Sequence, residues 1–180
     1  NLRSGTIATM LADAYRARGT RVVMGGIHAT ACPDEVLSHA DAVVLSEAED
    51  LWPRVLEDFK AKNLQPIYKG PLPDLAGKPR PRRDIFRSKK YIPFQVVQTM
   101  RGCPYPCEFC SVSTQNGVTM RFRPADEVMA ELRTLGKLIL FADDNVMIHR
   151  AYSKELFTKM IPLRKHWIGQ CSLAAVKRLE

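Results

Sequence analysis

Residues 93–100 read PFQVVQTM and predict a β-strand that runs directly into Arg101-Gly102-Cys103. Beyond this strand, the spacing of apolar residues predicts a helix over 124–135, a strand over 137–142, a helix over 151–161 and a strand over 167–173. The order strand, helix, strand, helix, strand is typical of a parallel sheet with crossover helices. Barrels of this kind carry their reactive groups at the carboxyl ends of the strands, and Cys103 follows the first strand closely.

The first 60 residues predict a second region of alternating helices and strands. Ser46 and Glu49 have the spacing of a capping box, so we expect Ser46 to cap the helix that follows it. The alternation predicts an open parallel sheet, and such sheets bind ligands at the carboxyl ends of their strands. We expect helices over 6–18, from Pro33 and from Ser46 to Phe59, and strands over 21–24 and 42–45, the first strand ending in Gly25-Gly26.

A basic, proline-rich stretch separates the two regions. The chain has a net charge of +8, and residues 61–95 hold nine Lys or Arg residues against two Asp residues. The same stretch contains six of the twelve prolines, which favours an extended, semi-rigid connector. We therefore predict a linker over 61–92, with a phosphate-binding strip as the alternative, and we do not expect nucleic acid as a partner.

Three of the five cysteines lie within eight residues, in the pattern CxxxCxxC formed by Cys103, Cys107 and Cys110. This crowding favours metal or redox chemistry over a disulfide framework. Three thiolates can hold three corners of an iron–sulfur cube and leave one iron open to a substrate or cofactor. Two alternatives remain open: a zinc site completed by a histidine, and a redox dithiol made by Cys107 and Cys110. We interpret Cys32 and Cys171 as core or loop residues.

The run VQTMRGCPYPCEFCS over 97–111 resembles the cluster loop of radical S-adenosylmethionine (SAM) enzymes, and the later RFRP segment over 121–124 is typical of the same superfamily. The resemblance implies that the three cysteines bind a 4Fe-4S cluster whose fourth iron is chelated by SAM. It also implies that Phe109 packs near the adenine. One electron from the reduced cluster would split SAM into methionine and a 5′-deoxyadenosyl radical.

Two further segments resemble the branch of this superfamily that carries a cobalamin-binding domain. The residues FADDN over 141–145 match the end of the second barrel strand, which implies that Asp143 and Asp144 contact the amino group of SAM. A helix-capping role for one of these two is the alternative. Residues 23–30, 33–35 and 46–50 resemble the second half of the cobalamin domain, which places Gly25, Gly26 and Ser46 near the nucleotide tail of cobalamin.

The fold class we predict is α/β, with three consecutive parts. Residues 1–60 form the C-terminal part of a Rossmann-like (flavodoxin-like) cobalamin-binding domain, 61–92 the linker, and 93–180 the N-terminal part of a radical SAM partial TIM barrel. Too few residues follow position 93 for a complete barrel, so we expect the chain to be a piece of a longer protein and inactive alone.

For the parent protein we expect methylation, or else ring formation or another rearrangement, with a small-molecule or lipid-like substrate. The resemblance implies an electron donor such as flavodoxin or ferredoxin. The sequence does not single out a catalytic side chain beyond the cofactor residues. No apolar run approaches the roughly 20 residues of a membrane span and no signal peptide opens the chain, so we expect a cytoplasmic protein.

Overall fold

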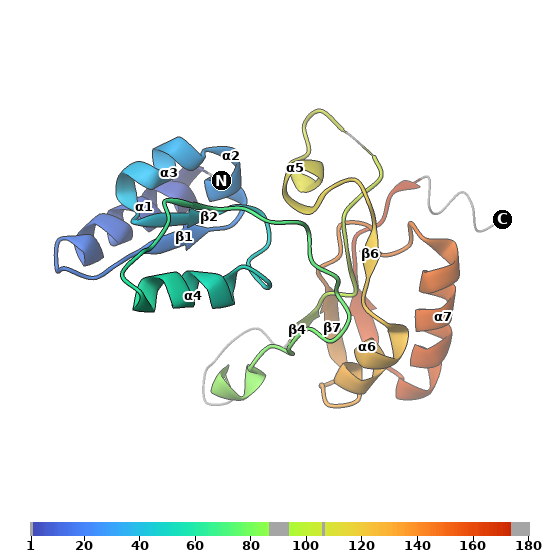
Figure 1. The fold of residues 1–180 in the computed structure, drawn as a ribbon. Coiled ribbons are helices and arrows are strands. Elements are labelled where there is room, and N and C mark those ends of the chain that lie inside the picture. Colours follow the sequence, from blue (N-terminus) through green and yellow to red (C-terminus); the bar gives the residue numbers. More distant parts are fainter. Residues whose placement is uncertain (1, 87–93, 106, 174–180) are drawn as a thin grey trace. The chain divides into compact units, whose positions relative to one another are not determined.

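The computed structural model describes residues 2–86, 94–105 and 107–173. The chain divides into two compact units, Asn1–Pro73 with Pro106–Gly117 and Asp74–Tyr105 with Val118–Glu180 (Figure 1). Each unit contains a three-stranded parallel sheet with helices packed on it. The predicted α/β class with parallel sheets is therefore confirmed.

The sheet of the first unit has the strand order β1-β2-β3. Val43 in the central strand packs with Ala29 and Val36 on one face, while Val44 packs with Val55 on the other. This alternation is the period-two pattern of a strand that is buried on both faces, and Figure 1 shows α3 and α4 on opposite sides of β1 and β2. The elements are α1 (Leu2–Arg16), β1 (Val23–Gly25), α2 (Ile27–Ala31), α3 (Pro33–His39), β2 (Ala42–Val44), α4 (Trp52–Lys60), β3 (Ile67–Tyr68) and α5 (Val112–Asn116).

The predicted capping box at Ser46 is wrong. Helix α4 begins at Trp52, its N-cap is Leu51, and no side chain caps it. Ser46 instead has a positive φ of 65° and its hydroxyl donates to the carbonyl of Gln115. The Ser-x-x-Glu pattern failed because this hydrogen bond joins residues 69 positions apart, which local spacing does not reveal.

Strand β3 lies within the range assigned to the linker. It contains only Ile67 and Tyr68, among prolines, and pairs with Val43 and Val44 of β2. The Tyr68 hydroxyl donates to Asp58 at 2.8 Å and accepts from the Gln65 backbone N–H, so this short strand is also held by a side chain. The linker range thus supplies the third strand of the first unit.

The second unit has the strand order β4-β7-β8, all parallel, as the alternation of strands and helices predicted. The predicted helices and strands are present; β4, α6, β7 and β8 are shorter than expected, whereas α7 has the predicted length and begins one residue earlier. An antiparallel pair, β5 with β6, was not predicted. The elements are η1 (Arg83–Phe86), β4 (Gln95–Val97), β5 (Met100–Arg101), β6 (Arg121–Phe122), α6 (Ala125–Leu132), β7 (Leu138–Phe141), α7 (Arg150–Met160), η2 (Ile161–Leu163) and β8 (His166–Ile168).

The two faces of this second sheet differ. Val97, Ile139 and Phe141 are buried in a core that includes Val128 and Leu132 of α6 and Leu156 of α7. The other face carries Val96, Leu140 and Ile168, which are neighbours in register across the three strands and are 49%, 36% and 55% exposed. Among the residues described, helices therefore pack against one face of this sheet. No helix within the described residues has the length and apolar character that a membrane span requires.

Candidate functional site

Polar residues follow all three strands of the second sheet at its carboxyl edge. The segments are Gln98-Thr99 after β4, Asp143-Asp144-Asn145 after β7, and Gln170-Cys171-Ser172 shortly after β8. The Asn145 amide donates to the Ser172 hydroxyl at 3.1 Å, and the Val146 N–H donates to the Gln170 carbonyl at 2.9 Å. These bonds tie the ends of β7 and β8 together at the edge where barrel enzymes place their chemistry.

Asp143 clasps the backbone that leads into the first cysteine. Its Oδ1 accepts hydrogen bonds from the N–H groups of Thr99 at 2.7 Å and Met100 at 2.9 Å, and its Oδ2 accepts from the Thr99 hydroxyl at 2.9 Å. The side chains of Asp143 and Thr99 are almost fully buried. Burial raises the pKa of Asp143, although the bonds from Met100 and Thr99 oppose this shift. The carboxylate therefore has a structural task at this edge, and its predicted contact with SAM stays a prediction.

Arg123 and Tyr152 hold the same segment from its other side. The Arg123 guanidinium donates to the Gln98 carbonyl at 2.8 Å, and its backbone N–H donates to the Thr99 carbonyl at 2.9 Å. The Tyr152 hydroxyl lies 2.8 Å from the Arg123 carbonyl and 3.2 Å from the Thr99 carbonyl, and its single proton can serve one of them at a time. Burial raises the pKa of Tyr152 to about 12, so this hydroxyl keeps its proton at neutral pH.

The three cysteines of the CxxxCxxC run are all free thiols. Cys103 belongs to the second unit and is half-buried. Cys107, which is exposed, and Cys110, which is half-buried, belong to the first unit, where the Cys110 N–H donates to the Cys107 carbonyl at 3.0 Å. Within the described parts of the chain, no three His, Cys, Asp or Glu side chains are arranged to hold a metal ion. That the three cysteines ligate one cluster stays a prediction.

The donor set fits an iron–sulfur cluster by its chemistry, since unpaired thiols so close in sequence can supply three thiolates to one cube. Phe109, next to the third cysteine, is 94% exposed, so its ring is free to stack on a flat ligand. Asp144 is half-buried beside the clasping Asp143. The SAM roles predicted for Phe109 and Asp144 also stay predictions.

Gly26 and Ser46 lie together at the carboxyl edge of the first sheet. The Thr30 hydroxyl joins them, because it donates to the Gly26 carbonyl at 2.9 Å and accepts from the Ser46 N–H at 2.8 Å. A Cβ on Gly25 would lie 3.2 Å from the Val44 carbonyl oxygen, whereas the corresponding position on Gly26, at φ 94°, has no atom within 4 Å. The edge thus combines tight backbone packing with open space beside Gly26. Such a cradle fits a ligand that approaches the main chain, while the predicted cobalamin contacts remain untested.

Gln115 of α5 covers part of this edge. The Ser46 hydroxyl donates to its carbonyl at 2.6 Å, and its side-chain amide donates to the Ser46 carbonyl at 2.8 Å. Its Oε1 is buried and has no hydrogen-bond partner among the described residues. Sequence reasoning missed Gln115 and Thr30, as it missed the positioning roles of Thr99 and Tyr152, because these contacts join distant parts of the chain.

No family model matches the chain. It is 30% identical to the bacteriochlorophyllide d C-12(1)-methyltransferase of Chlorobaculum tepidum over 96% of this chain and 41% of the relative. It is 33% identical to the C-8(2)-methyltransferase of the same organism over 64% of this chain and 27% of the relative. A hopanoid C-2 methylase of Rhodopseudomonas palustris is 25% identical over 88% of this chain and 32% of the relative. The chain thus spans less than half the length of these curated relatives, and it is homologous to methyltransferases.

Proposed function

We propose that the protein containing this chain is a radical SAM enzyme that methylates its substrate, with Cys103, Cys107 and Cys110 as the ligands of a 4Fe-4S cluster. The observation that carries the proposal is the set of three free thiols in a CxxxCxxC run whose first member, Cys103, lies six positions beyond Val97, the last residue of the parallel strand β4. The methyltransferase relatives support methylation over ring formation or rearrangement. When bound, the cluster supplies the electron that cleaves SAM to a 5′-deoxyadenosyl radical.

In this proposal, the described residues bind and orient the cofactors. Phe109 offers an exposed ring for the adenine, and Asp144 and Asp143 lie at the edge proposed to face the amino group of SAM. The clasp at Thr99 and Met100 fixes the direction in which the chain enters the cysteine loop. The substrate class, which we propose to be small-molecule or lipid-like, the electron donor and a cytoplasmic location belong to the proposal for the whole protein.

The finer fold assignments are supported by two features. Helices pack on one face of the sheet β4-β7-β8, and its other face carries the apolar row Val96, Leu140 and Ile168. An inner apolar face and an outer helical layer are typical of a (β/α) barrel, whereas an open sheet has helices on both faces. In the first unit, the helices on both faces and the open space beside Gly26 support a Rossmann-like cobalamin domain with Gly25, Gly26 and Ser46 near the ligand.

Anaerobic reconstitution of the full chain with iron and sulfide tests the cluster. We expect about four iron atoms per chain and a cubane signal in the electron paramagnetic resonance (EPR) spectrum after reduction. Changing Cys103, Cys107 or Cys110 to Ala should abolish this signal. Cys32→Ala and Cys171→Ala are the matched controls, because each removes a free thiol outside the run and should leave the signal unchanged.

The same experiment distinguishes the radical SAM proposal from the alternative, a zinc or dithiol module without radical chemistry. A zinc site would take up stoichiometric zinc and no iron. If Cys107 and Cys110 form a redox dithiol instead, the chain would form no cluster and Cys103→Ala would leave the redox activity of the pair unchanged. Either result would overturn the radical SAM proposal. Cobalamin is tested separately, since Gly26→Val should weaken cobalamin binding measured by absorbance without affecting iron uptake.

A further inference from the structure

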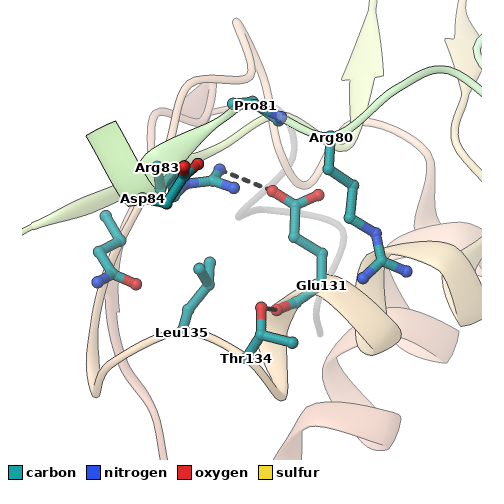
Figure 2. Close-up of a pocket in the computed structure, with 8 residues that line it drawn as sticks. Arg80, Pro81, Arg83, Asp84, Glu131, Thr134 and Leu135 are labelled. Carbon is teal, nitrogen blue, oxygen red and sulfur yellow. Dashed lines mark hydrogen bonds and ion pairs between the residues drawn. The ribbon is translucent and has the colours of Figure 1, made fainter. Parts of the chain in front are cut away.

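Glu131 is a charged residue on the buried face of helix α6. It is 1% exposed and lies among Val128 and Leu132, which are also buried. Two guanidinium groups meet its carboxylate: Arg83 Nη2 lies 2.6 Å from Oε1, and Arg123 Nη2 lies 2.7 Å from Oε2. Figure 2 shows Glu131 reaching toward Arg83 across the pocket. A buried carboxylate of this kind is tolerated because both oxygens face cations: Oε2 accepts a hydrogen bond from Arg123, and Oε1 forms an ion pair with Arg83 without hydrogen-bond geometry.

Both arginines also hold the backbone that leads to Cys103. Arg83 donates to the carbonyl of Val96 at 2.5 Å, and Arg123 donates to the carbonyl of Gln98 at 2.8 Å. Glu131 itself touches neither carbonyl, but it orients both guanidinium groups through its two oxygens. One buried carboxylate on α6 therefore fixes two carbonyls at the end of β4 through two charged hydrogen-bond donors.

The charge balance explains why the carboxylate is needed. The Arg83 and Arg123 side chains are only 23% and 13% exposed, so without Glu131 two poorly hydrated cations would face each other. Arg83 comes from the basic stretch, and its neighbour Arg82 pairs with Asp84 at 2.7 Å. Arg83 is therefore used inside the unit, whereas the Arg82 pair lies at the surface.

We propose that Glu131 is a positioning residue for the cysteine loop: through Arg83 and Arg123 it sets the path of residues 96–99 and hence the direction in which the chain presents Cys103. The inference rests on the proposed function only for the statement that the cysteine loop binds an iron–sulfur cluster. The positioning itself is a property of the chain without a cluster.

The first measurement is hydrogen exchange of residues 94–105 in the iron-free full chain. Glu131→Gln keeps the shape of the side chain and removes its charge. Because charged hydrogen bonds contribute more than neutral ones, we expect exchange in this segment to be faster by at least about tenfold. If Glu131→Gln does not fold, Arg83→Gln takes its place in the experiment. It removes one of the two guanidinium groups bound to Glu131 and should also accelerate exchange in residues 94–105.

Two control variants on the same helix separate positioning from general destabilisation. Asp126→Asn breaks an ion pair with Lys159 at the surface, where Asp126 is 87% exposed, and should leave exchange unchanged. Val128→Ala weakens the packing of α6 without touching either arginine, so it should lower the melting temperature without a selective effect on residues 94–105. If Glu131→Gln and Val128→Ala accelerate exchange in this segment equally at matched stability, the inference is overturned.

The second measurement uses the reconstituted protein. Glu131→Gln should change the EPR line shape of the reduced cluster and weaken iron retention by about 10-fold, the effect typical of residues that orient metal ligands, while both controls keep the wild-type spectrum. A wild-type spectrum in Glu131→Gln would overturn the inference. If the wild-type chain takes up no iron, the proposed function fails, and hydrogen exchange alone still decides whether Glu131 positions the segment.

Discussion

Changing Asp143 tests whether this residue acts on the protein backbone or on SAM. Asp143→Ala would remove the acceptor of the N–H groups of Thr99 and Met100, both of which donate to the single oxygen Oδ1. Thr99 and Met100 are 0% and 1% exposed, so water does not readily replace the carboxylate. An orphaned buried donor costs about 1–3 kcal/mol, which predicts a loss of about 2–6 kcal/mol in the free energy of unfolding.

Asp143→Asn is the informative partner of this variant. Its side-chain oxygen can still accept from both backbone N–H groups, and its amide can donate to the Thr99 hydroxyl, which then acts as acceptor. We therefore expect Asp143→Asn to lie within about 1 kcal/mol of the wild type. The charge is lost, however, so a direct ionic contact with the amino group of SAM would be weakened in this variant alone.

Urea denaturation of the three proteins measures the stability change, and equilibrium dialysis with the reconstituted protein measures SAM binding. If Asp143 only positions the backbone, Asp143→Asn binds SAM as the wild type does, and Asp144→Asn becomes the variant expected to weaken binding. The proposed role of the Asp143 hydrogen bonds to Thr99 and Met100 would be refuted by either of two results. One is a decrease in the free energy of unfolding of under about 1 kcal/mol in Asp143→Ala, and the other is an equal decrease in Asp143→Ala and Asp143→Asn.

Two further predictions concern pH and the edge of the first sheet. Because burial raises the pKa of Asp143, the folded protein binds the proton of this carboxyl more tightly than the unfolded protein does. Protonation of Asp143 therefore contributes to the free energy of unfolding. This contribution is complete below the pKa of Asp143 in the unfolded protein and is lost as the pH rises through its pKa in the folded protein. The stability of the wild type relative to Asp143→Asn should therefore fall with rising pH in the acid range, and a difference that stays constant in urea titrations would contradict the burial effect. Gln115→Ala removes the donor to the Ser46 carbonyl, which contributes about 1 kcal/mol, and should speed hydrogen exchange in residues 107–117. Gln65→Ala, which breaks only a local bond to Asn63, is the control and should not change exchange there.

The order of elements was predictable because each long segment carries its own period of apolar residues. Val97, Ile139 and Phe141 lie on the buried face of their strands, and Val128 and Leu132 lie on the buried side of α6, as local patterns require. The two-residue strands were not predictable, since Ile67-Tyr68 and Arg121-Phe122 are too short to show a period. The same limit explains Ser46, whose partner Gln115 is remote in sequence.

The spacing of the cysteine run predicts its chemistry, which stays a prediction, but the residues that position the run could not be predicted from spacing. Glu131 gave one usable signal, a charged residue at the centre of an apolar helix face, which indicates a buried partner of opposite charge. The identity of that partner depends on the fold, because Arg83 and Arg123 are 48 and 8 residues away. The resemblance of residues 141–145 to a known strand end implied a ligand contact for Asp143, whereas the structure gives its carboxylate three hydrogen-bond donors within the protein.

The segment that leads to Cys103 is held by side chains because its pairing with the neighbouring strand ends before it. Strand β4 ends at Val97, whose carbonyl still accepts from Ala142 N–H, and β5 begins at Met100 with a different partner strand. Between them, the peptide groups of Gln98 and Thr99 are held by Arg123, Tyr152 and Asp143 instead of by neighbouring strands. Buried peptide groups must find partners, so each of these side chains constrains the turn from the sheet into the cysteine loop. A loop fixed in this way can be redirected by changes far from its cysteines, and variation at Asp143, Arg123 or Glu131 should change the path of the loop without changing the cysteines themselves.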